Sequence, residues 1–436
     1  MSAIIPPRLM SGMQEYMPEE QAYFNGLKDI IRGSFEKFGF FPIETPTLEL
    51  TEIILAKGGG ETDKQVYQFE KGKNNISLPF DLTVPLARYV SQYKNELQIP
   101  FRRYQIQKVW RAERAQKGRF REFYQCDVDI VGAPELAADA EIIAAMFHTL
   151  KALEIPPFTF RINNRKIYDG ILVGLGHENQ LAEVLRTIDK LEKIGPDEVT
   201  RLLKEEGLSD EAVQKLTTFS STRGPAADVI SQLDTLDYGQ AFTSGLNEIK
   251  DLVELLPKFG VDATSVHLDM SITRGLDYYT GMVCETVCAE FEDLGSICSG
   301  GRYDNLVENF SKEAHTGVGM SIGLSRLFTR LKVRVDSTRN PVVKLMILPT
   351  HENYVSRAVE VSTLFRQKGI NTEILYGIRK LQKQLKQANA RKVPHCLILG
   401  DDEVKNDFFT LKDMVTGDQI RVEAAAIQTF IQKTWF

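Results

Sequence analysis

The sequence predicts an α+β protein with two domains, the larger of which contains an antiparallel sheet flanked by helices and interrupted by a helical insertion. Three observations lead to this prediction. Strand-like and helical segments follow one another up to about residue 332, but residues 177–257 are rich in Leu, Lys, Glu and Asp and have almost no strand signal. From residue 343 a strand–helix alternation predicts a small α/β domain. The length of 436 residues also exceeds that of one ordinary core.

The first part of the chain predicts a helix followed by strands. Residues 21–38 have apolar side chains at helical spacing and end at Gly39. Residues 40–46 resemble a strand, but Pro42 and Pro46 confine it to the edge or the end of a sheet. The elements expected next are strands at 102–112 and 123–131, a helix at 135–153 and a strand at 158–163.

After the insertion, the β pattern returns at residue 266. Strands are expected at 266–272, 282–290 and 296–304, and a helix with an apolar face in 319–331. Residues 333–342 are polar and contain a proline, which is typical of a linker. The C-terminal domain is expected to add a hairpin around Thr416 and Gly417 and a last helix.

Composition excludes several classes of protein. Hydrophobic residues make up 43% and charged residues 26% of the chain, as in globular proteins. No apolar run of 18 or more residues predicts a membrane span, and the N-terminus does not resemble a signal peptide. The net charge of -6 excludes an overall basic nucleic-acid binder, although basic clusters can still bind RNA locally. Five dispersed cysteines without a CxxC pair fit a reducing cytoplasm.

The sequence contains no metal-binding or nucleophile motif. The six histidines show no HxxxH or Cys–His ligand spacing. No GxSxG motif is present, nor a phosphate-binding Walker A or GxGxxG loop.

The segment 101–121 is strongly basic, with eight Lys or Arg and one acid, Glu113. In an extended strand Val109, Arg111 and Glu113 would point to the same face. An arginine held in a cleft can bind a phosphate or a carboxylate as a fork, and Arg119 follows in the loop. The alternative is a basic hairpin that is simply exposed to solvent.

Two further segments combine polar groups at close spacing. In TRGLDYYTG, residues 273–281, an arginine, an aspartate and two tyrosines could select a small polar ligand, or could form an ordinary turn. In PFDLTVPLARY, Asp81 and Thr83 could lie on one face of a strand and bind an amino group. Equally, they could form the N-terminal cap of a helix that starts near Pro85.

Two glycine-rich segments complete the candidates. Gly300 and Gly301 in CSGGRYDNL would let a ligand approach the backbone closely, although most such pairs form plain turns. In GVGMSIGLSRL, small residues precede a helix that carries Arg326. Tight packing of this helix on the sheet is the alternative to a binding role.

The order of these segments resembles the three motifs of class II aminoacyl-tRNA synthetases. TRGLDYYTG is similar to the histidine-recognition segment of the histidyl-tRNA synthetase family, and DLTVPLARY to its substrate-binding strand. WRAERAQKGRFREFYQCDVDIVG resembles the second motif of that family, with its loop. The C-terminal unit, with LMILP and GDDEV, resembles the anticodon-binding domain of this subclass. The implied domains are a class II catalytic domain at 1–332 with a helical insertion at about 175–260, a linker at 333–342 and an anticodon-binding domain at 343–436.

The resemblance implies that ATP and histidine are substrates, with Mg²⁺ as the metal. Arg111 would bind the α-phosphate, Glu113 the adenine edge, Arg119 the outer phosphates, and Arg326 the adenine and the γ-phosphate. The implied histidine-binding residues are Asp81, Thr83, Gln125, Asp129, Arg274, Tyr278 and Tyr279. The first four would hold the α-amino group, and the two tyrosines would lie near the imidazole. Arg274, beside the α-phosphate and the carboxylate, would be catalytic together with Arg111.

The resemblance also implies tRNA(His) as a partner and a C2 homodimer that forms through the first motif, around residues 38–46. The basic segment 379–392 has six Lys or Arg and no acid. It is expected to contact tRNA phosphates through Arg379, Lys380 and Lys383, unless it is only a solvated helix face.

Three alternatives stay open. The regulatory subunit of ATP phosphoribosyltransferase resembles the synthetase but lacks the C-terminal domain, so residues 343–436 argue against it. A sister synthetase for proline, threonine or glycine is disfavoured by residues 273–281. The third alternative is an RNA-binding protein with an inactive synthetase fold.

Overall fold

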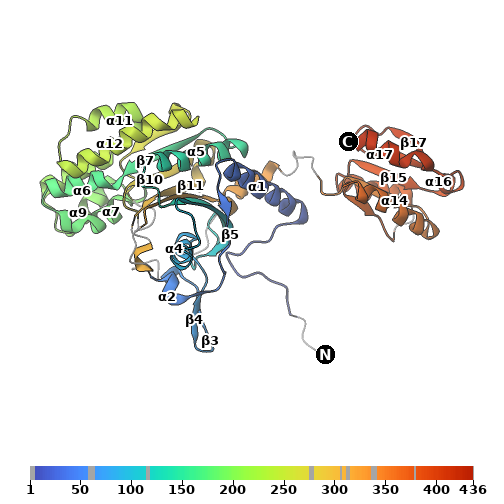
Figure 1. Cartoon of the computed structure of the whole chain (residues 1–436), viewed down its shortest axis with the longest axis horizontal. Helices are drawn as coiled ribbons and strands as arrows, with labels where there is room; N and C mark the ends of the chain where they lie inside the picture. Colours follow the sequence, from blue (N-terminus) through green and yellow to red (C-terminus); the bar gives the residue numbers. More distant parts are fainter. Residues whose placement is uncertain are drawn as a thin grey trace. The chain divides into compact units, whose positions relative to one another are not determined.

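The computed structural model describes residues 5–56, 64–113, 118–273, 279–304, 307–310, 315–334, 341–377 and 380–435. The chain divides into two compact units, a large one built mainly from residues 24–332 and a small one built mainly from residues 333–436 (Figure 1). Among the described residues, no helix is long and apolar enough to cross a membrane.

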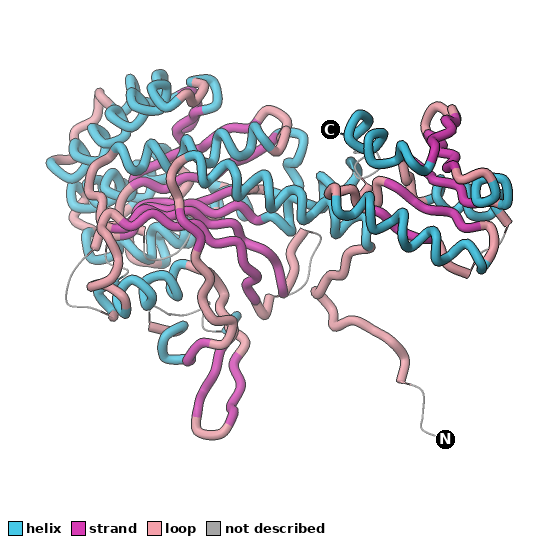
Figure 2. Tube along the Cα trace, turned by 45° about the vertical axis from the view of Figure 1, so that its right-hand side comes forward, coloured by secondary structure: helices cyan, strands magenta, loops and turns pink. Residues whose placement is uncertain are grey.

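The large unit is built on a nine-stranded sheet (Figure 2). Its order is β1 (Phe41–Pro42), β5 (Phe101–Trp110), β6 (Glu122–Val131), β12 (Gly317–Gly323), β11 (Cys298–Tyr303), β10 (Met282–Cys288), β7 (Phe158–Asn164), β9 (Val266–Asp269) and β8 (Arg223–Pro225). All neighbours from β5 to β7 pair antiparallel, whereas β1–β5 and β7–β9 pair parallel. The predicted antiparallel sheet is therefore confirmed at its centre, and parallel pairs near both ends make it mixed.

The two faces of this sheet differ in polarity because side chains alternate along each strand. In β6, Cys126, Val128 and Ile130 are fully buried on one face. Helix α5 (Ala137–Ala152) covers this apolar face, since it contacts β6, β11 and β12 and its Asp139 carboxylate accepts hydrogen bonds from Arg302 of β11. The opposite face is left for the polar side chains of β6.

Two helices extend the core of the large unit. α1 (Pro18–Lys37) begins three residues before and ends one residue before the helix expected at 21–38, and it buries Phe24, Leu27, Ile31 and Phe35. α13 (Leu324–Leu331) follows β12 directly and packs on β6. The rings of Phe24 and Phe328 meet edge-on, with centroids 5.0 Å apart, and join the two helices.

The expected insertion is mainly helical. Its helices are α6 (Arg165–Gly174), α7 (Leu181–Ile188), α8 (Leu191–Ile194), α9 (Pro196–Glu205), α10 (Asp210–Ser220), α11 (Ala226–Leu233) and α12 (Gln240–Leu255). α6 and α12 pack closely at Gly170, where a Cβ atom would lie 2.4 Å from the backbone nitrogen of Phe242. The insertion also supplies β8, whose three residues are too few to show an alternating pattern.

The structure corrects the interpretation of residues 79–89 as a strand. Helix α4 (Thr83–Gln92) begins at Thr83, and the Asp81 carboxylate accepts a hydrogen bond from the backbone N–H of Val84 at 3.1 Å. The alternative, an N-terminal cap, is the observed one, because the carboxylate satisfies an amide that the first turn leaves unpaired. Nearby lies a three-stranded sheet that the sequence did not indicate, with β2 (Glu49–Leu50), β4 (Asn74–Ser77) and β3 (Gln68–Lys71). The short helix α2 (Thr51–Ile54) follows β2.

The strand expected at 102–112 ends earlier than predicted. β5 stops at Trp110, where its pairing with Glu122 of β6 ends. Arg111 and Glu113 therefore lie beyond the strand, and strand alternation does not determine where they point. One further backbone hydrogen bond, from Arg111 N–H to the Arg121 carbonyl at 2.9 Å, keeps Arg111 on the hairpin.

The small unit has the predicted strand–helix order. Its sheet runs β14 (Thr372–Ile374), β13 (Leu345–Pro349), β15 (His395–Leu399), β16 (Phe408–Asp413) and β17 (Gln419–Glu423), parallel over the first three strands and antiparallel over the last three. Its helices are α14 (Val355–Gln367), α15 (Leu381–Ala390), α16 (Asp401–Lys405) and α17 (Ile427–Trp435). The predicted hairpin is present, with Gly417 at a φ of 86°. Residues 335–340 of the expected linker lie outside the described residues.

Candidate active site

Two cavities lie on the polar face of the large sheet and share one wall. The shared residues are Arg111, Gln125, Ser299 and Ser321. One cavity, of about 140 Å³, is lined by Arg111, Glu113, Arg119 and Arg326 among others, and we call it the arginine cavity. The other, of about 130 Å³, is lined by Asp81, Asp127 and Asp129 among others, and we call it the carboxylate cavity. They form two compartments of one cleft.

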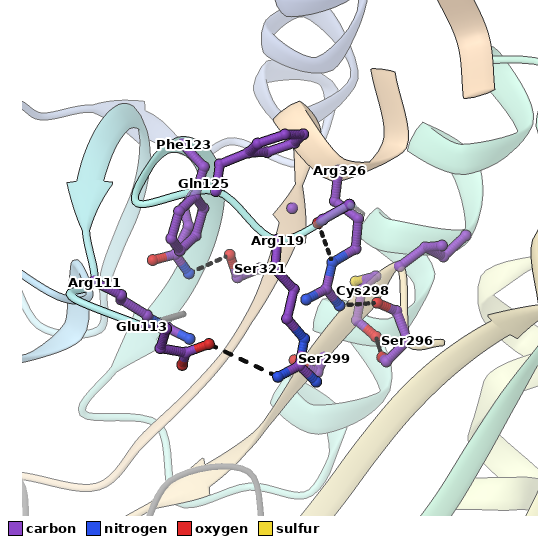
Figure 3. Close-up of a pocket in the computed structure, with 14 residues that line it drawn as sticks. Arg111, Glu113, Arg119, Phe123, Gln125, Ser296, Cys298, Ser299, Ser321 and Arg326 are labelled. Carbon is purple, nitrogen blue, oxygen red and sulfur yellow. Dashed lines mark hydrogen bonds and ion pairs between the residues drawn. The ribbon is translucent and has the colours of Figure 1, made fainter. Parts of the chain in front are cut away.

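Three guanidinium groups surround the arginine cavity (Figure 3). Arg326 of α13 donates hydrogen bonds to the carbonyl oxygens of Gly118 at 3.3 Å and Ser296 at 3.1 Å. Burial, and then the nearby charges of Arg119 and Arg111, lower the pKa of Arg326. The positive charges are thus close enough to repel one another.

Glu113, the acidic residue that lines the arginine cavity, compensates little of the positive charge of the three arginines. Arg119 and Glu113 are 3.7 Å apart at their closest charged atoms, and both side chains are partly exposed. Arg111 is held by neutral groups instead: its Nε donates to the Phe80 carbonyl at 3.0 Å, and its guanidinium lies 5.2 Å from the centre of the Phe123 ring. With three arginines and one glutamate, the cavity has a net positive charge, which suits a polyanion such as a nucleoside triphosphate.

The carboxylate cavity has the opposite charge. Its side chains Asp127 and Asp129 come from alternate positions of β6, and both have Arg103 of β5 behind them. The Arg103 guanidinium is 2.7 Å from Asp129 Oδ2 but 3.9 Å from Asp127 Oδ2. Tyr303 donates its hydroxyl proton to Asp129 Oδ1 at 2.6 Å. Burial raises the pKa of Asp129, and it raises the pKa of Asp127 to about 7, an effect that Arg103 partly offsets.

The glycines of the two glycine-rich segments make room for these side chains. A Cβ atom at Gly319 would lie 2.0 Å from Asp129 Oδ1. A Cβ atom at Gly301 would lie 2.5 Å from the carbonyl oxygen of Met282 and 3.0 Å from the ring of Tyr279. Both glycines are in strands, not in a turn, so close packing of the carboxylate cavity explains them.

The structure brings most of the predicted site residues to this cleft. Arg111, Glu113, Arg119 and Arg326 line the arginine cavity. Asp81, Thr83, Gln125, Asp129 and Tyr279 line the carboxylate cavity. Arg274, Tyr278 and Arg379 lie outside the described residues. Lys380 and Lys383 are exposed in the small unit, at the start of α15.

Several cleft residues were not predicted from the sequence. Asp127 lies on β6 between Gln125 and Asp129, and strand alternation alone could have identified it. Ser299 and Ser321 are opposite each other on β11 and β12, a pairing that the sequence does not reveal. Arg103 is fully buried and lies behind the carboxylates of Asp127 and Asp129. Predicting this position would have required the register of β5 and β6.

Comparison with known proteins extends over both units. Residues 12–327 match the family model "Histidyl-tRNA synthetase", and residues 344–434 match the model "Anticodon binding domain".

Full-length relatives agree with these matches. A histidine--tRNA ligase from Clostridium tetani is 44% identical over 422 residues, which covers 95% of this chain and 96% of the relative. One from Finegoldia magna is 42% identical, covering 96% and 98% of the two chains. The crystal structure of a histidyl-tRNA synthetase from a Nostoc species superimposes with a TM-score of 0.85 at 36% identity, over 99% of this chain and all of that one. The chain therefore belongs to the histidyl-tRNA synthetase family, and it carries that family's catalytic fold followed by an anticodon-binding domain.

Proposed function

We propose that this aminoacyl-tRNA synthetase activates histidine in the cleft, with ATP in the arginine cavity and histidine in the carboxylate cavity. The observation that carries the proposal is that two cavities of opposite charge meet at Arg111, Gln125, Ser299 and Ser321. A triphosphate suits the first cavity and an α-ammonium group suits the second. The reacting atoms, the carboxylate of histidine and the α-phosphorus of ATP, would then meet at the shared wall.

The reaction explains why arginine is the dominant side chain. A carboxylate oxygen of histidine attacks the α-phosphorus of ATP and forms a C–O–P bond. The bond from the α-phosphorus to the oxygen that bridges to the β-phosphate breaks, and pyrophosphate leaves with that electron pair. Both reactants are anionic, so fixed cations such as Arg111 reduce their repulsion and stabilise the charge that develops on phosphate oxygens. No protein base is needed, because the attacking carboxylate is already ionised.

The nucleotide-binding roles follow the family pattern. Arg111 at the shared wall would bind the α-phosphate, and Arg119 would reach the outer phosphates. Arg326 would stack on the adenine and touch the γ-phosphate, while Glu113 would accept a hydrogen bond from the adenine edge. Their position around one positively charged cavity supports these assignments.

The histidine-binding roles are proposed on the same basis. Asp81, Thr83, Gln125 and Asp129 would hold the α-amino group, and Tyr279 would lie near the imidazole. All five residues line the carboxylate cavity. For Arg274 beside the carboxylate and Tyr278 near the imidazole, the resemblance alone supports the proposal.

The donor set around the cleft fits Mg²⁺ held mainly by ATP. Mg²⁺ in nucleotide sites usually has one or two carboxylate ligands, completed by phosphate oxygens and water. Within the described ranges, no three His, Cys, Asp or Glu side chains are grouped to hold a metal by themselves. Glu285 of β10 is opposite Ser299 of the shared wall and acts electrostatically on Arg326. We propose Glu285 as the protein ligand, and bound Mg²⁺ would neutralise phosphate charge.

The second step and the assembly are also proposed from the family. A terminal ribose hydroxyl of tRNA(His) would attack the activated carbonyl and release AMP. The small unit would bind the anticodon, with Lys380 and Lys383 on phosphates and Arg379 proposed from the resemblance alone. A homodimer would form through the first motif, residues 38–46, where Phe41 is 70% exposed on the edge strand β1. Five free, buried thiols support a reducing cytoplasm as the location.

The alternatives have less support than the ligase. A regulatory subunit of ATP phosphoribosyltransferase would not need the anticodon-binding domain that matches residues 344–434. An RNA-binding protein with an inactive synthetase fold would not need three arginines around one cavity. A sister synthetase is disfavoured because the family model for the histidine enzyme matches residues 12–327.

One assay separates these possibilities. ATP–pyrophosphate exchange is measured with each of the twenty amino acids, followed by charging of tRNA(His). We expect exchange only with histidine, and transfer of that histidine to the tRNA. Exchange with another amino acid, or none with histidine, would contradict the proposed activation, and exchange without charging would contradict the transfer step.

A further inference from the structure

Asp127 is a third carboxylate of the carboxylate cavity, besides Asp81 and Asp129, and the family pattern gives it no role. Its side chain is only 5% exposed. Its Oδ1 atom is buried and has no hydrogen-bond partner among the described residues, and the same is true of Gln125 Oε1. Both residues line the carboxylate cavity. Buried acceptors are normally satisfied, so two unsatisfied ones in one cavity indicate a ligand that donates hydrogen bonds.

The sheet holds the two acceptors side by side. Gln125 and Asp127 are alternate residues of β6, and the strand opposite, β12, presents Ser321 to them. The Gln125 amide donates to the Ser321 hydroxyl oxygen at 2.9 Å, which fixes the amide so that Oε1 remains the accepting atom. Ser321 is opposite Asp127 in the sheet and lowers the pKa of the Asp127 carboxylate, which favours its ionised form.

The charges around Asp127 favour a cationic ligand. Arg103 is the cation behind it, but its guanidinium is 2.7 Å from Asp129 and 3.9 Å from Asp127. Arg103 also donates to the Gln105 side chain and the Leu82 carbonyl, both at 3.4 Å. The other groups that face the cavity are Asp81 on the α4 side, Arg111 at the shared wall, and Tyr279 and Tyr303, whose burial raises the pKa and keeps them neutral.

We propose that Asp127 is a further histidine-binding residue, whose Oδ1 accepts a hydrogen bond from the α-ammonium group while Gln125 Oε1 accepts another. This inference rests on the proposed binding of histidine in the carboxylate cavity. An ammonium group has three N–H donors, which can satisfy both Asp127 Oδ1 and Gln125 Oε1. Its positive charge also balances the Asp127 carboxylate, whose charge Arg103 compensates only in part. Gln125 also belongs to the shared wall, which keeps the ammonium next to the reacting carboxylate.

The test compares two ligands on two proteins. Calorimetric titrations use the full-length wild type and Asp127→Asn, each with histidine and with imidazolepropionate, which lacks the amino group. We expect D127N to weaken histidine binding by about 10- to 100-fold, since a buried charge-assisted hydrogen bond is lost. The affinity for imidazolepropionate should change by less than about threefold, because this ligand never makes that bond. ATP binding in the arginine cavity should be unaltered, which reports an intact cleft.

Other outcomes separate the two proposals. If the wild type binds histidine and D127N binds it equally well, Asp127 is not a ligand, although the proposed function stands. An equal loss for both ligands would also overturn the assignment, because Asp127 would then act on the imidazole or on the fold. Failure of the wild type to bind histidine would instead contradict the proposed function. Should D127N fold poorly, Gln125→Met, which removes the second acceptor, must show the same selectivity for histidine over imidazolepropionate.

Discussion

Arg103 allows two aspartates to lie side by side in the carboxylate cavity. It is fully buried and pairs with Asp129, while Asp127 keeps only a distant contact with it. The pKa of Asp127 is raised to about 7, above its ordinary value, mainly by burial. The folded protein therefore holds a carboxylate that is costly to ionise, and we attribute this cost to the need for charge at the proposed histidine-binding site.

Asp127→Asn should accordingly stabilise the ligand-free protein at alkaline pH. Because the folded state raises the pKa, it binds more protons than the unfolded state between about pH 4 and pH 7, and the free energy of unfolding falls as pH rises through this window. D127N removes that dependence and should be more stable than the wild type at pH 8 by roughly 1–3 kcal/mol. Urea unfolding at pH 5 and pH 8 measures the difference. A wild type as stable as D127N at pH 8 would show that Asp127 ionises without cost.

Arg111→Ala should abolish most histidine-dependent pyrophosphate exchange without unfolding the protein. Arg111 contacts neutral groups, so its removal leaves no buried carboxylate unpaired. Loss of one preorganised cation at the α-phosphate should lower kcat by about 100-fold or more. Exchange kinetics and circular dichroism give the two readouts, and near-normal exchange would reject the role at the α-phosphate.

Gly319→Ala should impair histidine use selectively. The new Cβ atom would lie 2.0 Å from Asp129 Oδ1, so the carboxylate must move and its bond to Tyr303 must change. We expect the KM for histidine to rise at least about tenfold, with a smaller effect on the KM for ATP. Gly26→Ala in α1 is the matched control, because its Cβ atom would meet nothing within 4 Å. Equal kinetics of the two variants would contradict the close packing at Gly319.

At the level of elements, the sequence predicts those with a strong periodic pattern. The α1 helix, the hairpin β5–β6, helix α5 and the strand–helix order of the small unit follow from apolar spacing and turn residues. β8 and the three-stranded sheet are too short for such a pattern. The helix from Thr83 was ambiguous because Asp81 and Thr83 suit a strand face as well as a helix cap, and only the observed bond to Val84 decides between them.

The cleft itself depends on register, which the sequence does not contain. Residue types identified Arg111 and Arg326, and the family resemblance identified Gln125. The pairing of β6 with β12 and of β12 with β11 brings Asp127, Ser321 and Ser299 together with them. The buried Arg103 could not be recognised from its sequence neighbours.

The contact between β11 and α5 gives a prediction about stability at this scale. Arg302 donates to both Asp139 oxygens at 3.1 Å, and Asp139 is fully buried. Asp139→Ala leaves the buried guanidinium with only the partly exposed carboxylate of Asp304, 3.7 Å away, and should lower the free energy of unfolding by about 3–5 kcal/mol. Glu198→Ala, which breaks an exposed pair with Arg201 on α9, should have no measurable effect in the same urea titration. If the two substitutions lowered the free energy of unfolding equally, burial of the ion pair would not determine its contribution to stability.

At the scale of the whole molecule, we expect the two units to have different roles. The large unit holds the cleft, and the small unit carries an exposed basic helix start at Lys380 and Lys383. Neither lysine lines the arginine cavity or the carboxylate cavity, so we expect their contribution to be confined to tRNA binding.

The double variant Lys380→Glu/Lys383→Glu should raise the KM for tRNA(His) by about tenfold and weaken its salt dependence, since phosphate contacts are lost. Pyrophosphate exchange, which needs no tRNA, should remain unchanged. The double variant Lys368→Glu/Lys405→Glu, at exposed lysines that follow α14 and end α16 in the same unit, is the charge-matched control. A loss of exchange in the first double variant, or an equal loss of tRNA affinity in the control, would contradict this division of labour.

The most direct test of the central claim, that two cavities of opposite charge form one active site, is a crystal structure with a non-hydrolysable histidyl-adenylate analogue such as histidyl-sulfamoyl-adenosine. We predict that the adenosine lies in the arginine cavity against Arg326, that the histidyl group lies in the carboxylate cavity with its ammonium on Gln125 and Asp127, and that Arg111 contacts the sulfamoyl group between them. An analogue bound in the reverse orientation, or with its histidyl group outside the carboxylate cavity, would contradict the account.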